Sequence, residues 1–486
     1  MRDMVVLLNL DDRSCRSMAR RLRAEHLYCK ILPACATAAD IAAQDALGIL
    51  LAGAARGEAP AMPNLQQLLD SGLPILAMGD AALTLVQHLG GFLGEKAPEP
   101  GVRQVRLDAE DPLTAGVASG ERFLPACRCM TLPAALRPIA QTDGGVLGFR
   151  AGEQPVYGLA FLPEPNDPDA TQLLLHFCKD ICGCTLWWST QTFLERAREE
   201  IDRLCQNTEA VCALSGGVDS GVCALLGNLA IGHRLHCLLI DTGLLRKGEA
   251  DEVMSVYRDT LGLNVTRVNA SGEFLTALRG VTDSVEKERI IHRLLQEVIQ
   301  REAGRIPGVT RLLQGTNYTD ALDSPCLDMA GTGSPLLVVE PVRELFKDEI
   351  RRVGEELQLP PAVTSRQPFP GSGLALRILT DVTEERLDIL RDADGIFRAE
   401  IEQSGQNKRL WQYFATLACD PLPGAAGYVV TLRAVQVIDG NLAVASRLPY
   451  DLLERVTQAI LTRLPAVHRV LYDFTPSQSY ASIEWR

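Results

Sequence analysis

The feature that most constrains the fold is a series of short apolar runs, each of which ends in Gly, Asp or Asn. Four of them lie in the middle of the chain, in "EAVCALSGG", "RLHCLLIDTG", "LNVTRVNA" and "RLLQGTN". Continuous apolar runs of this length are typical of strands that are buried on both faces. Helical stretches separate them, so we expect an open, mostly parallel α/β sheet whose ligands bind beyond the carboxyl ends of the strands.

Two further regions flank these runs. At the start of the chain, "MVVLLNL", "ALGILLAG" and "LPILAMG" repeat the pattern of a strand followed by a turn, which again predicts a parallel α/β sheet. Near the end, strand-like "YVVTLRAVQVI" and "HRVLYDF" surround helical "YDLLERVTQAILTRL", which predicts an α+β region. We therefore predict three domains, at residues 1–186, 187–367 and 368–486.

Composition and charge limit the partners. A chain of 486 residues that is 47% hydrophobic can build several full cores. The formal net charge of −13 argues against non-specific binding to nucleic acid or to anionic membrane, which requires clustered Lys and Arg. Because the sequence contains no apolar run of membrane-spanning length and its start is acidic, we expect a cytoplasmic protein without nucleic-acid or membrane partners.

The 14 cysteines do not follow a metal-binding pattern. The only clusters are "CRC" and "CKDICGC", and neither has a second ligand pair or His partners at a suitable distance. We expect buried, reduced thiols.

The junction "ALSGGVDS", residues 213–220, suits a polyphosphate. Two glycines between a strand and a helix let backbone N–H groups approach an anion closely, and the helix adds its positive N-terminal end. Ser215 and Ser220 can donate hydrogen bonds, whereas Asp219 can face an anion only across a Mg²⁺ ion. The lysine of a Walker loop and the spacing of a dinucleotide fingerprint are both missing from this junction.

The segment "LSGGVDS" is similar to the signature of the ATP pyrophosphatases, or PP-loop family. Longer segments resemble the GMP synthetases among them, namely "IDTGLLRKGEA", "LLQGTNYTDALDS", "VVEPVRELFKDEIRRVG", "PFPGSGLALRIL", "LRAVQVIDG", "RLPYDLLERV" and "ASIEWR". This resemblance is strong after residue 187 and faint before it. It implies a flavodoxin-like glutaminase-type domain, a Rossmann-like ATP pyrophosphatase domain and a small α+β C-terminal domain through which two copies form a homodimer.

The resemblance also implies roles for individual residues. The loop that binds ATP would consist of Ser215, Gly216, Gly217, Val218, Asp219 and Ser220, with Asp219 as the Mg²⁺ ligand. The adenosine side would be formed by Asp241, Gly315 and Thr316, and Lys347 would be the lid lysine that approaches the phosphates. The substrate residues would be Asp320, Pro370, Gly371 and Glu484. Asp219 and Lys347 are thus the expected catalytic residues, and ATP and Mg²⁺ the expected cofactors.

The first domain departs from the family at its glutaminase residues. Gly79, in "AMGDA", stands where the family has its nucleophilic cysteine. Leu162 replaces the histidine of "FHPE", while Glu164 remains. Without nucleophile and base, glutamine cannot be hydrolysed by the thioester route, so we expect ammonia to be used directly or delivered by another protein. The degenerate domain is retained either for its packing or because it binds a donor protein.

A second departure concerns the substrate. The segment after Asp323, "SPCLDMAGTGSPLL", is shorter than in the family and lacks the "SHHNVGGLP" stretch. Ser477 or Gln478 replaces a lysine associated with nucleotide phosphate, and Gln367 replaces the histidine of "HPFPG". A neutral side chain cannot replace a charge-assisted phosphate contact at similar strength. These changes argue against xanthosine monophosphate and leave a purine nucleotide or a related small molecule as the expected substrate.

Three functions remain open from the sequence. The first is an ammonia-dependent, GMP synthetase-like enzyme that adenylates a carbonyl oxygen. The second is a PP-loop enzyme that inserts sulfur into a small molecule through Cys326, with a separate sulfur donor protein. The third is a non-catalytic regulator that binds nucleotide. The intact loop at 215–220 favours an enzyme.

Overall fold

The computed structural model describes residues 3–54, 59–94, 100–124, 127–152, 154–161, 168–323, 336–367, 369–420, 427–438 and 442–476. The chain divides into two compact units, Met1–Phe193 and Leu194–Arg486, and helix α6 (Thr190–Cys205) contains the point of division. Within the described ranges, no helix is both long and apolar enough to cross a lipid bilayer. Most described cysteines are buried, reduced thiols, as predicted, and Cys35 and Cys419 are exposed.

The first unit is built on parallel strands in the order β2-β1-β3-β4-β11. Their bounds are β1 (Val5–Asn9), β2 (Cys29–Pro33), β3 (Gly48–Ala52), β4 (Ile75–Met78) and β11 (Val156–Leu159). The side chains of β3, β4 and β11 are buried along the whole strand, which explains their continuous apolar sequences. The connecting helices are α1 (Asp12–Ala24), α2 (Ala38–Ala42), α3 (Leu65–Asp70), α4 (Asp80–His88) and α5 (Pro168–Leu175). The predicted parallel α/β sheet is confirmed.

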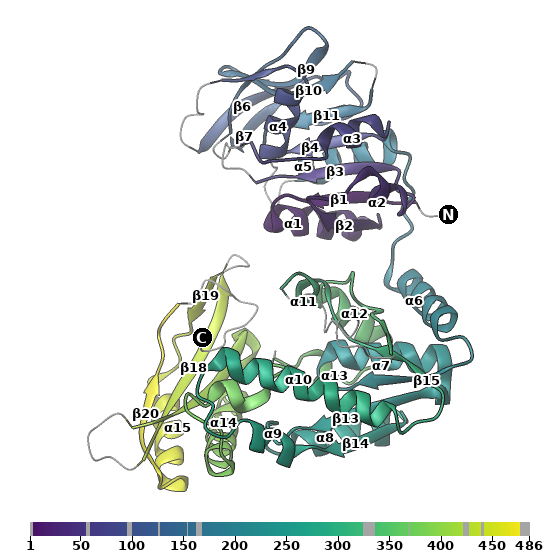
Figure 1. Cartoon of the computed structure of the whole chain (residues 1–486). Coiled ribbons are helices and arrows are strands. Elements are labelled where there is room, and N and C mark those ends of the chain that lie inside the picture. Colours follow the sequence, from purple (N-terminus) through teal and green to yellow (C-terminus); the bar gives the residue numbers. More distant parts are fainter. Residues whose placement is uncertain are drawn as a thin grey trace. The chain divides into compact units, whose positions relative to one another are not determined.

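Antiparallel strands extend the same sheet beyond β11 (Figure 1). They follow in the order β10 (Gly145–Ala151), β9 (Leu136–Thr142), β6 (Gly101–Leu107) and β7 (Gly120–Leu124). The short strands β5 (Phe92–Leu93) and β8 (Met130–Thr131) pair beside them. The alternating burial of β6 shows why the sequence did not predict it, because only one face of this strand is covered.

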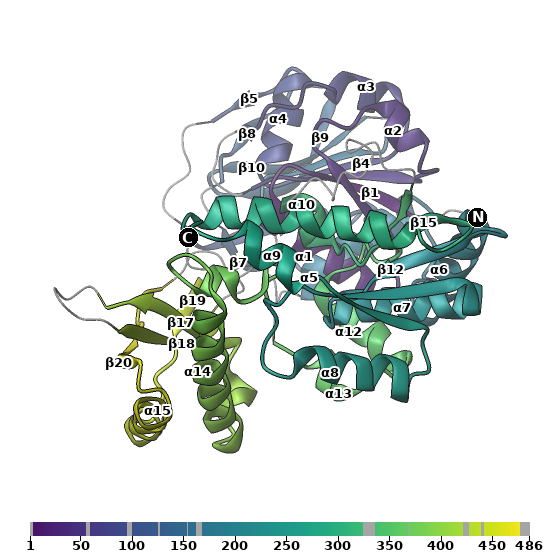
Figure 2. The same ribbon diagram turned by 60° about the horizontal axis from the view of Figure 1, so that its bottom comes forward.

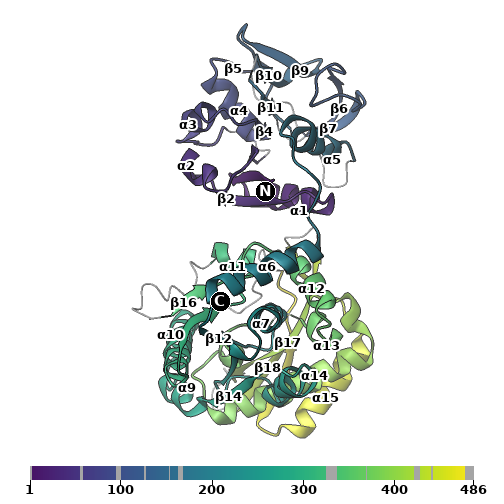
Figure 3. The same ribbon diagram turned by 90° about the vertical axis from the view of Figure 1, so that its right-hand side faces the viewer.

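The second unit contains a parallel sheet in the order β14-β13-β12-β15-β16. Its strands are β12 (Glu209–Ala213), β13 (Leu235–Asp241), β14 (Val265–Asn269), β15 (Val309–Leu313) and β16 (Leu337–Val339). Figure 3 shows α7 (Val218–Ile231) and α12 (Lys347–Glu356) on one side of this sheet and α9 (Ser271–Ala277) and α10 (Ser284–Ala303) on the other. The short helices α8 (Glu249–Met254), α11 (Tyr318–Asp323) and α13 (Pro361–Thr364) lie in its connections. The sequence predicted β12 to β15 at these places.

The rest of the second unit is an α+β layer, as predicted (Figure 2). Its sheet consists of β17 (Gln412–Cys419), β18 (Tyr428–Ile438), β19 (Leu442–Ala445) and β20 (Val467–Tyr472). Helices α14 (Glu384–Gln403) and α15 (Tyr450–Arg463) pack against this sheet. One apolar core runs from the parallel sheet into this layer, since Leu238, Phe274, Phe397 and Leu432 belong to the same cluster of buried residues. The division into three domains at residues 187 and 368 stays a prediction.

Candidate active site

The glycine loop lies between β12 and α7. Gly216 has a φ of +78°, the left-handed region that only glycine adopts without strain. A Cβ at this position would lie 2.5 Å from Cγ2 of Val253, which belongs to α8. Gly217 is extended and is the N-cap of α7. The backbone therefore requires glycine at position 216, whereas the conformation of Gly217 is open to other residues. The loop ends at the amino terminus of a helix, as the sequence predicted.

Two serines brace the loop. The Oγ atoms of Ser215 and Ser220 are 2.9 Å apart, and the backbone N–H of Gly217 donates to Ser215 Oγ at 3.3 Å. Ser220 Oγ also donates to the carbonyl oxygen of Gly217 at 3.2 Å. Ser215 is exposed and Ser220 is buried. The hydroxyls thus hold the turn in shape, with Ser215 on its solvent side.

The two carboxylate oxygens of Asp219 have different surroundings. Oδ2 accepts a hydrogen bond from Lys347 Nζ and a longer one, of 3.4 Å, from Nδ2 of Asn317. Oδ1 is buried and has no hydrogen-bond partner. A buried carboxylate oxygen without a partner is costly unless a further ligand binds it. Oxygen of this kind is what Mg²⁺ prefers, so the residues present fit a magnesium ion.

The end of β15 packs directly against the start of α7. A Cβ on Gly315 would lie 2.7 Å from both the carbonyl carbon of Asp219 and the amide nitrogen of Ser220. The next residue, Thr316, is buried, and its Oγ1 atom has no hydrogen-bond partner. The structure therefore brings Gly315 and Thr316 to the glycine loop, although about 100 residues of chain separate them.

Asp241 ends β13, the strand beside β12. Its Oδ2 atom accepts from Nη2 of Arg267 at 2.6 Å, and its Oδ1 accepts from the backbone N–H of Gly243 at 3.1 Å. The hydrogen bond to Asp241 raises the pKa of the Arg267 guanidinium above its ordinary value. Arg267 also donates to Asp251, so it is shared between two carboxylates.

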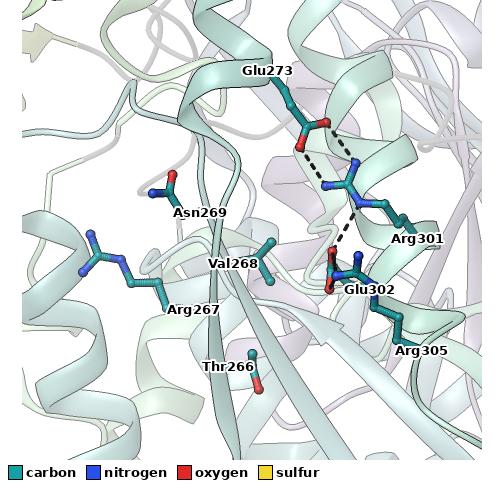
Figure 4. A pocket seen from close by; sticks show the side chains of 8 residues that line it. All are labelled: Thr266, Arg267, Val268, Asn269, Glu273, Arg301, Glu302 and Arg305. Atoms are coloured by element: carbon teal, nitrogen blue, oxygen red, sulfur yellow. Dashed lines mark hydrogen bonds and ion pairs between the residues drawn. The ribbon is translucent and has the colours of Figure 1, made fainter.

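A cavity of about 540 Å³ lies along the outer strand β14 (Figure 4). Its arginines are already engaged: Arg301 forms two hydrogen bonds of 2.9 Å with Glu273, and Arg305 forms two with Glu302. Arg267, in the same wall, binds Asp241. Since these cations are neutralised by neighbouring carboxylates, the cavity is not a strong anion site, and the glycine loop remains the better candidate for phosphate.

The predicted substrate residues are placed only in part. Asp320 lies on α11, and its Oδ2 accepts from the backbone N–H of Asn317 at 3.4 Å. The carbonyl oxygen of Pro370 accepts from Gly373 N–H at 2.9 Å, and Gly371 is exposed. Cys326 and Glu484 lie outside the described residues.

Gln367, which we expected in the substrate pocket, is used elsewhere. Its Nε2 donates to the carbonyl oxygen of Tyr413 at 3.1 Å, and its Oε1 accepts from the N–H of the same residue at 2.9 Å. Both polar ends of the side chain thus pair with the backbone of β17. Ser477 and Gln478, the other substitutions at that end of the chain, lie outside the described residues.

Gly79 stands at the sharp turn between β4 and α4 in the first unit. Its backbone has φ +63° and ψ −137°, a conformation that strains other residues. The following N–H group, of Asp80, donates to the carbonyl oxygen of Ala54 at 2.7 Å. The turn therefore has the tight strand-to-helix form expected of a nucleophile position, but it carries no side chain and the next amide is already paired. Leu162 and Glu164 lie outside the described residues.

Comparisons with known proteins identify the relatives of this chain. A GMP synthase (glutamine-hydrolysing) of Caldicellulosiruptor saccharolyticus is 37% identical over 511 aligned positions, which cover 99% of each chain. The enzymes of the same name from Clostridium perfringens and Geobacillus kaustophilus are 35% and 34% identical, again over at least 99% of each chain. The chain belongs to the GMP synthase family. The model of the GMP synthase C terminal domain matches residues 399–485. As a member of this family the chain is an ATP-dependent ligase of the GMP synthase type.

Sequence reasoning missed the residues that hold the site together. Asn317 is buried and donates to Asp219. Arg366 donates to the carbonyl oxygen of Gly216 at 3.0 Å, and Glu249 accepts from Arg366. Asn317 directly follows Gly315 and Thr316, so its position was a usable signal. Glu249 lies in the segment "IDTGLLRKGEA", which marked the region but not a role for this residue, and nothing in the sequence pattern marked Arg366.

Proposed function

We propose that this member of the GMP synthase family adenylates a carbonyl oxygen of a purine nucleotide or a related compound and then aminates it with ammonia rather than with glutamine. The observation that carries the proposal is the arrangement of the glycine loop, Asp219 and Lys347 at the amino terminus of α7. Full-length similarity to GMP synthases supports the same reaction type.

The loop supplies what a leaving pyrophosphate needs. Backbone N–H groups at the start of α7 and the Ser215 hydroxyl offer hydrogen bonds to phosphate oxygens, and the helix dipole favours negative charge at this end. Lys347 Nζ lies next to Asp219 and contributes the one side-chain cation that we assign to the phosphates. Such a cation lowers the barrier because it offsets charge that develops on pyrophosphate as the bond breaks.

Asp219 is the residue that we propose to hold Mg²⁺, through its unpartnered Oδ1 atom. When bound, the ion supplies positive charge to the phosphate oxygens. Asp219 would thereby keep the triphosphate fixed relative to the loop, because both are anchored at the first turn of α7. The carboxylate can bind Lys347 with one oxygen and the ion with the other.

The proposed reaction has two steps. The carbonyl oxygen of the substrate forms a bond to the α-phosphorus of ATP, the bond between the α- and β-phosphates breaks, and its electron pair leaves with pyrophosphate. Ammonia then forms a C–N bond at the activated carbon, the bond from that carbon to the oxygen of AMP breaks, and a proton passes to solvent. Each molecule of ATP yields one of AMP and one of pyrophosphate.

The proposed use of ammonia rests on Gly79. A glutaminase of this type needs a cysteine side chain at the turn and an unpaired amide to bind the oxyanion. Gly79 provides no nucleophile, and the N–H of Asp80 is taken by Ala54. Ammonia would come from solution or from a donor protein. The homodimer through the C-terminal domain and the cytoplasmic location stay predictions.

The experiment is to measure pyrophosphate release from Mg·ATP by the full-length protein in the presence of xanthosine monophosphate. Ammonium, glutamine and sulfide are supplied in parallel reactions, and Asp219→Ala serves as the control that removes the proposed magnesium ligand. We expect turnover with ammonium and none with glutamine, and loss of turnover in the control.

Other outcomes are equally informative. Turnover with glutamine would contradict the loss of the glutaminase. Turnover with sulfide alone would favour the sulfur-inserting alternative and make Cys326→Ser the next variant. Binding of Mg·ATP without turnover under any condition would show that xanthosine monophosphate is not the substrate, and other purine nucleotides should then be tested.

A further inference from the structure

Arg366 connects the glycine loop to a buried carboxylate. Its Nη1 atom donates to the carbonyl oxygen of Gly216 at 3.0 Å, and its Nη2 atom donates to Oε1 of Glu249 at 2.5 Å. The side chain of Arg366 is 17% exposed and that of Glu249 is 3% exposed. Hydrogen bonds between charged groups in such surroundings are stronger than those between neutral groups. The guanidinium is therefore held in one orientation.

Glu249 is itself fixed. It is the first residue of α8, and its second oxygen, Oε2, accepts from the backbone N–H of Arg246 at 2.8 Å. Both oxygens are thus used, one for the chain before α8 and one for Arg366. Val253, one turn further along α8, is the residue that leaves no room for a side chain at Gly216. Helix α8 therefore both excludes a side chain at Gly216, through Val253, and orients Arg366, through Glu249.

The contact with the Gly216 carbonyl decides where the next amide points. In a trans peptide the C=O and N–H groups point to opposite sides. Because Arg366 donates to the carbonyl oxygen of Gly216, the N–H of Gly217 must face away from Arg366. It donates instead to Ser215 Oγ, at 3.3 Å. That side of the loop is where the phosphates are proposed to bind. Without Arg366, the glycine pair can rotate this peptide at little steric cost.

Arg366 also begins the segment that contains Pro370 and Gly371. The far end of this segment is held by the chain that follows β13, since the N–H of Leu374 donates to the carbonyl oxygen of Leu244 at 2.8 Å. Gly373 has a φ of +63°, and a Cβ there would lie 2.5 Å from that same oxygen. The segment is thus anchored at both ends, at the glycine loop by Arg366 and next to the end of β13 by Leu374.

We propose that Arg366 is a positioning residue for the reaction: it sets the peptide between Gly216 and Gly217 so that its N–H, which donates to Ser215 Oγ, lies on the side of the loop where the phosphates of ATP are proposed to bind, and it holds the loop next to the residues that follow it, Pro370 and Gly371 among them. This inference rests on the proposed function, because it assumes that ATP binds at the loop. Arg366 acts through the backbone and does not itself contact the reacting atoms.

The test compares two variants of the full-length protein with a matched control. Arg366→Lys keeps a charge beside Glu249 but loses the forked geometry that reaches Gly216, and Arg366→Met removes both contacts. Arg311→Lys is the control, because Arg311, on β15, also donates from Nε to a backbone carbonyl oxygen, that of Leu204 in α6, at 2.8 Å. Binding of Mg·ATP is measured by titration calorimetry, and KM and kcat are measured from pyrophosphate release.

We expect Arg366→Lys to raise both the Kd of Mg·ATP and the KM for ATP roughly tenfold or more, the effect of losing one charge-assisted hydrogen bond. Arg311→Lys should change neither. A purely structural role would lower the fraction of folded protein and leave Kd and KM of the remainder unchanged. If Arg366→Met does not fold, Arg366→Lys still tests the proposal, because its charge can pair with Glu249 and the variant is therefore expected to fold.

Failure of the inference can be told from failure of the proposed function. If the wild-type protein binds no Mg·ATP, both are wrong. If the wild-type protein binds Mg·ATP and folded Arg366→Lys binds it equally well with an unchanged KM, the proposed function stands and the role of Arg366 is overturned. In that case the Gly216 peptide keeps its orientation through Ser215 and Ser220 alone.

Discussion

Lys347 Nζ donates to Oδ2 of Asp219, although 128 positions separate the two residues in the sequence. Lys347 is the first residue of α12, Asp219 lies in the first turn of α7, and the two helices pack against each other. A cation at the amino end of a helix is opposed by the helix dipole. The position of Lys347 therefore does not serve the stability of α12, and the geometry favours a role toward Asp219 and the ligand of the loop.

We predict that Lys347→Met lowers the rate of pyrophosphate release by about 100-fold or more, because one preorganised group that stabilises transition-state charge typically contributes this much. The matched control is Lys247→Met, which removes an exposed lysine paired with Asp392 at 2.7 Å. The control should retain the wild-type rate, since exposed ion pairs contribute little. Steady-state assays at saturating ATP provide the measurement, and equal rates in the two variants would exclude Lys347 from catalysis.

The backbone of Gly216 gives a second prediction. Gly216→Ala places a Cβ in the left-handed region and 2.5 Å from Val253, so we expect it to lose Mg·ATP binding and to lower the unfolding temperature. Gly280→Ala is a matched control, because Gly280 has a φ of +74° but open space around its Cβ position. It should show the cost of left-handed backbone alone, of the order of 1 kcal/mol. Calorimetric binding and thermal unfolding of both variants would separate strain from steric conflict, and normal ATP binding by Gly216→Ala would contradict the loop geometry.

The sequence predicted those strands and turns that are determined by their own residues rather than by distant partners. Strands β1, β3, β4, β12 and β13 are buried along most of their length, so their apolar runs could be recognised without knowing their neighbours. The outer strand β14 is mostly exposed and was located by its place in the repeated pattern of strand and turn. The glycine loop was also predictable, because its residues are contiguous and the left-handed backbone at Gly216 requires a glycine. Strands β6 to β10 were not predicted. In β6 and β7 buried or half-buried residues alternate with exposed ones, and β9 and β10 contain polar, Gly and Pro residues among their apolar ones, so none of the four has a continuous apolar run.

The candidate site was predictable where residues are contiguous and not where the tertiary structure assembles it. Ser215 to Ser220 form one segment, and its resemblance to the PP-loop signature located it. Asn317 and Arg366 reach the loop only because β15 and α13 bring them there. For Gln367, the sequence showed only that a neutral side chain replaces the histidine of the family; the pairing of its amide with the backbone of Tyr413 depends on the tertiary structure.

The role of Gln367 can be measured directly. Gln367→Leu keeps the approximate size of the side chain but leaves the N–H and C=O groups of Tyr413 without partners, so we expect a loss of about 1 to 3 kcal/mol in the free energy of unfolding. Gln458→Leu, at an exposed position on α15, is the control and should change stability little. Urea unfolding followed by tryptophan fluorescence gives both values. Equal stability of the two variants would show that the paired hydrogen bonds to β17 do not contribute.

The first unit allows a test of the proposed loss of glutamine hydrolysis. We predict that Gly79→Cys, which restores a thiol at the turn, does not restore glutaminase activity. Gly79 adopts φ +63° and ψ −137°, so a cysteine there costs about 1 to 3 kcal/mol in strain. The amide that should bind the oxyanion, that of Asp80, stays paired with the carbonyl oxygen of Ala54, and Leu162 cannot act as a base for the thiol.

Release of glutamate from glutamine, measured with and without ATP, provides the assay. Gly72→Cys, at an exposed turn with a φ of +73° and open space at its Cβ position, controls for an added thiol in a left-handed backbone. Glutamate release by Gly79→Cys above that of this control would contradict the prediction, because it would show that the cysteine alone restores the activity. The hydrogen bond between the Asp80 N–H and the carbonyl oxygen of Ala54 would then have to break when glutamine binds.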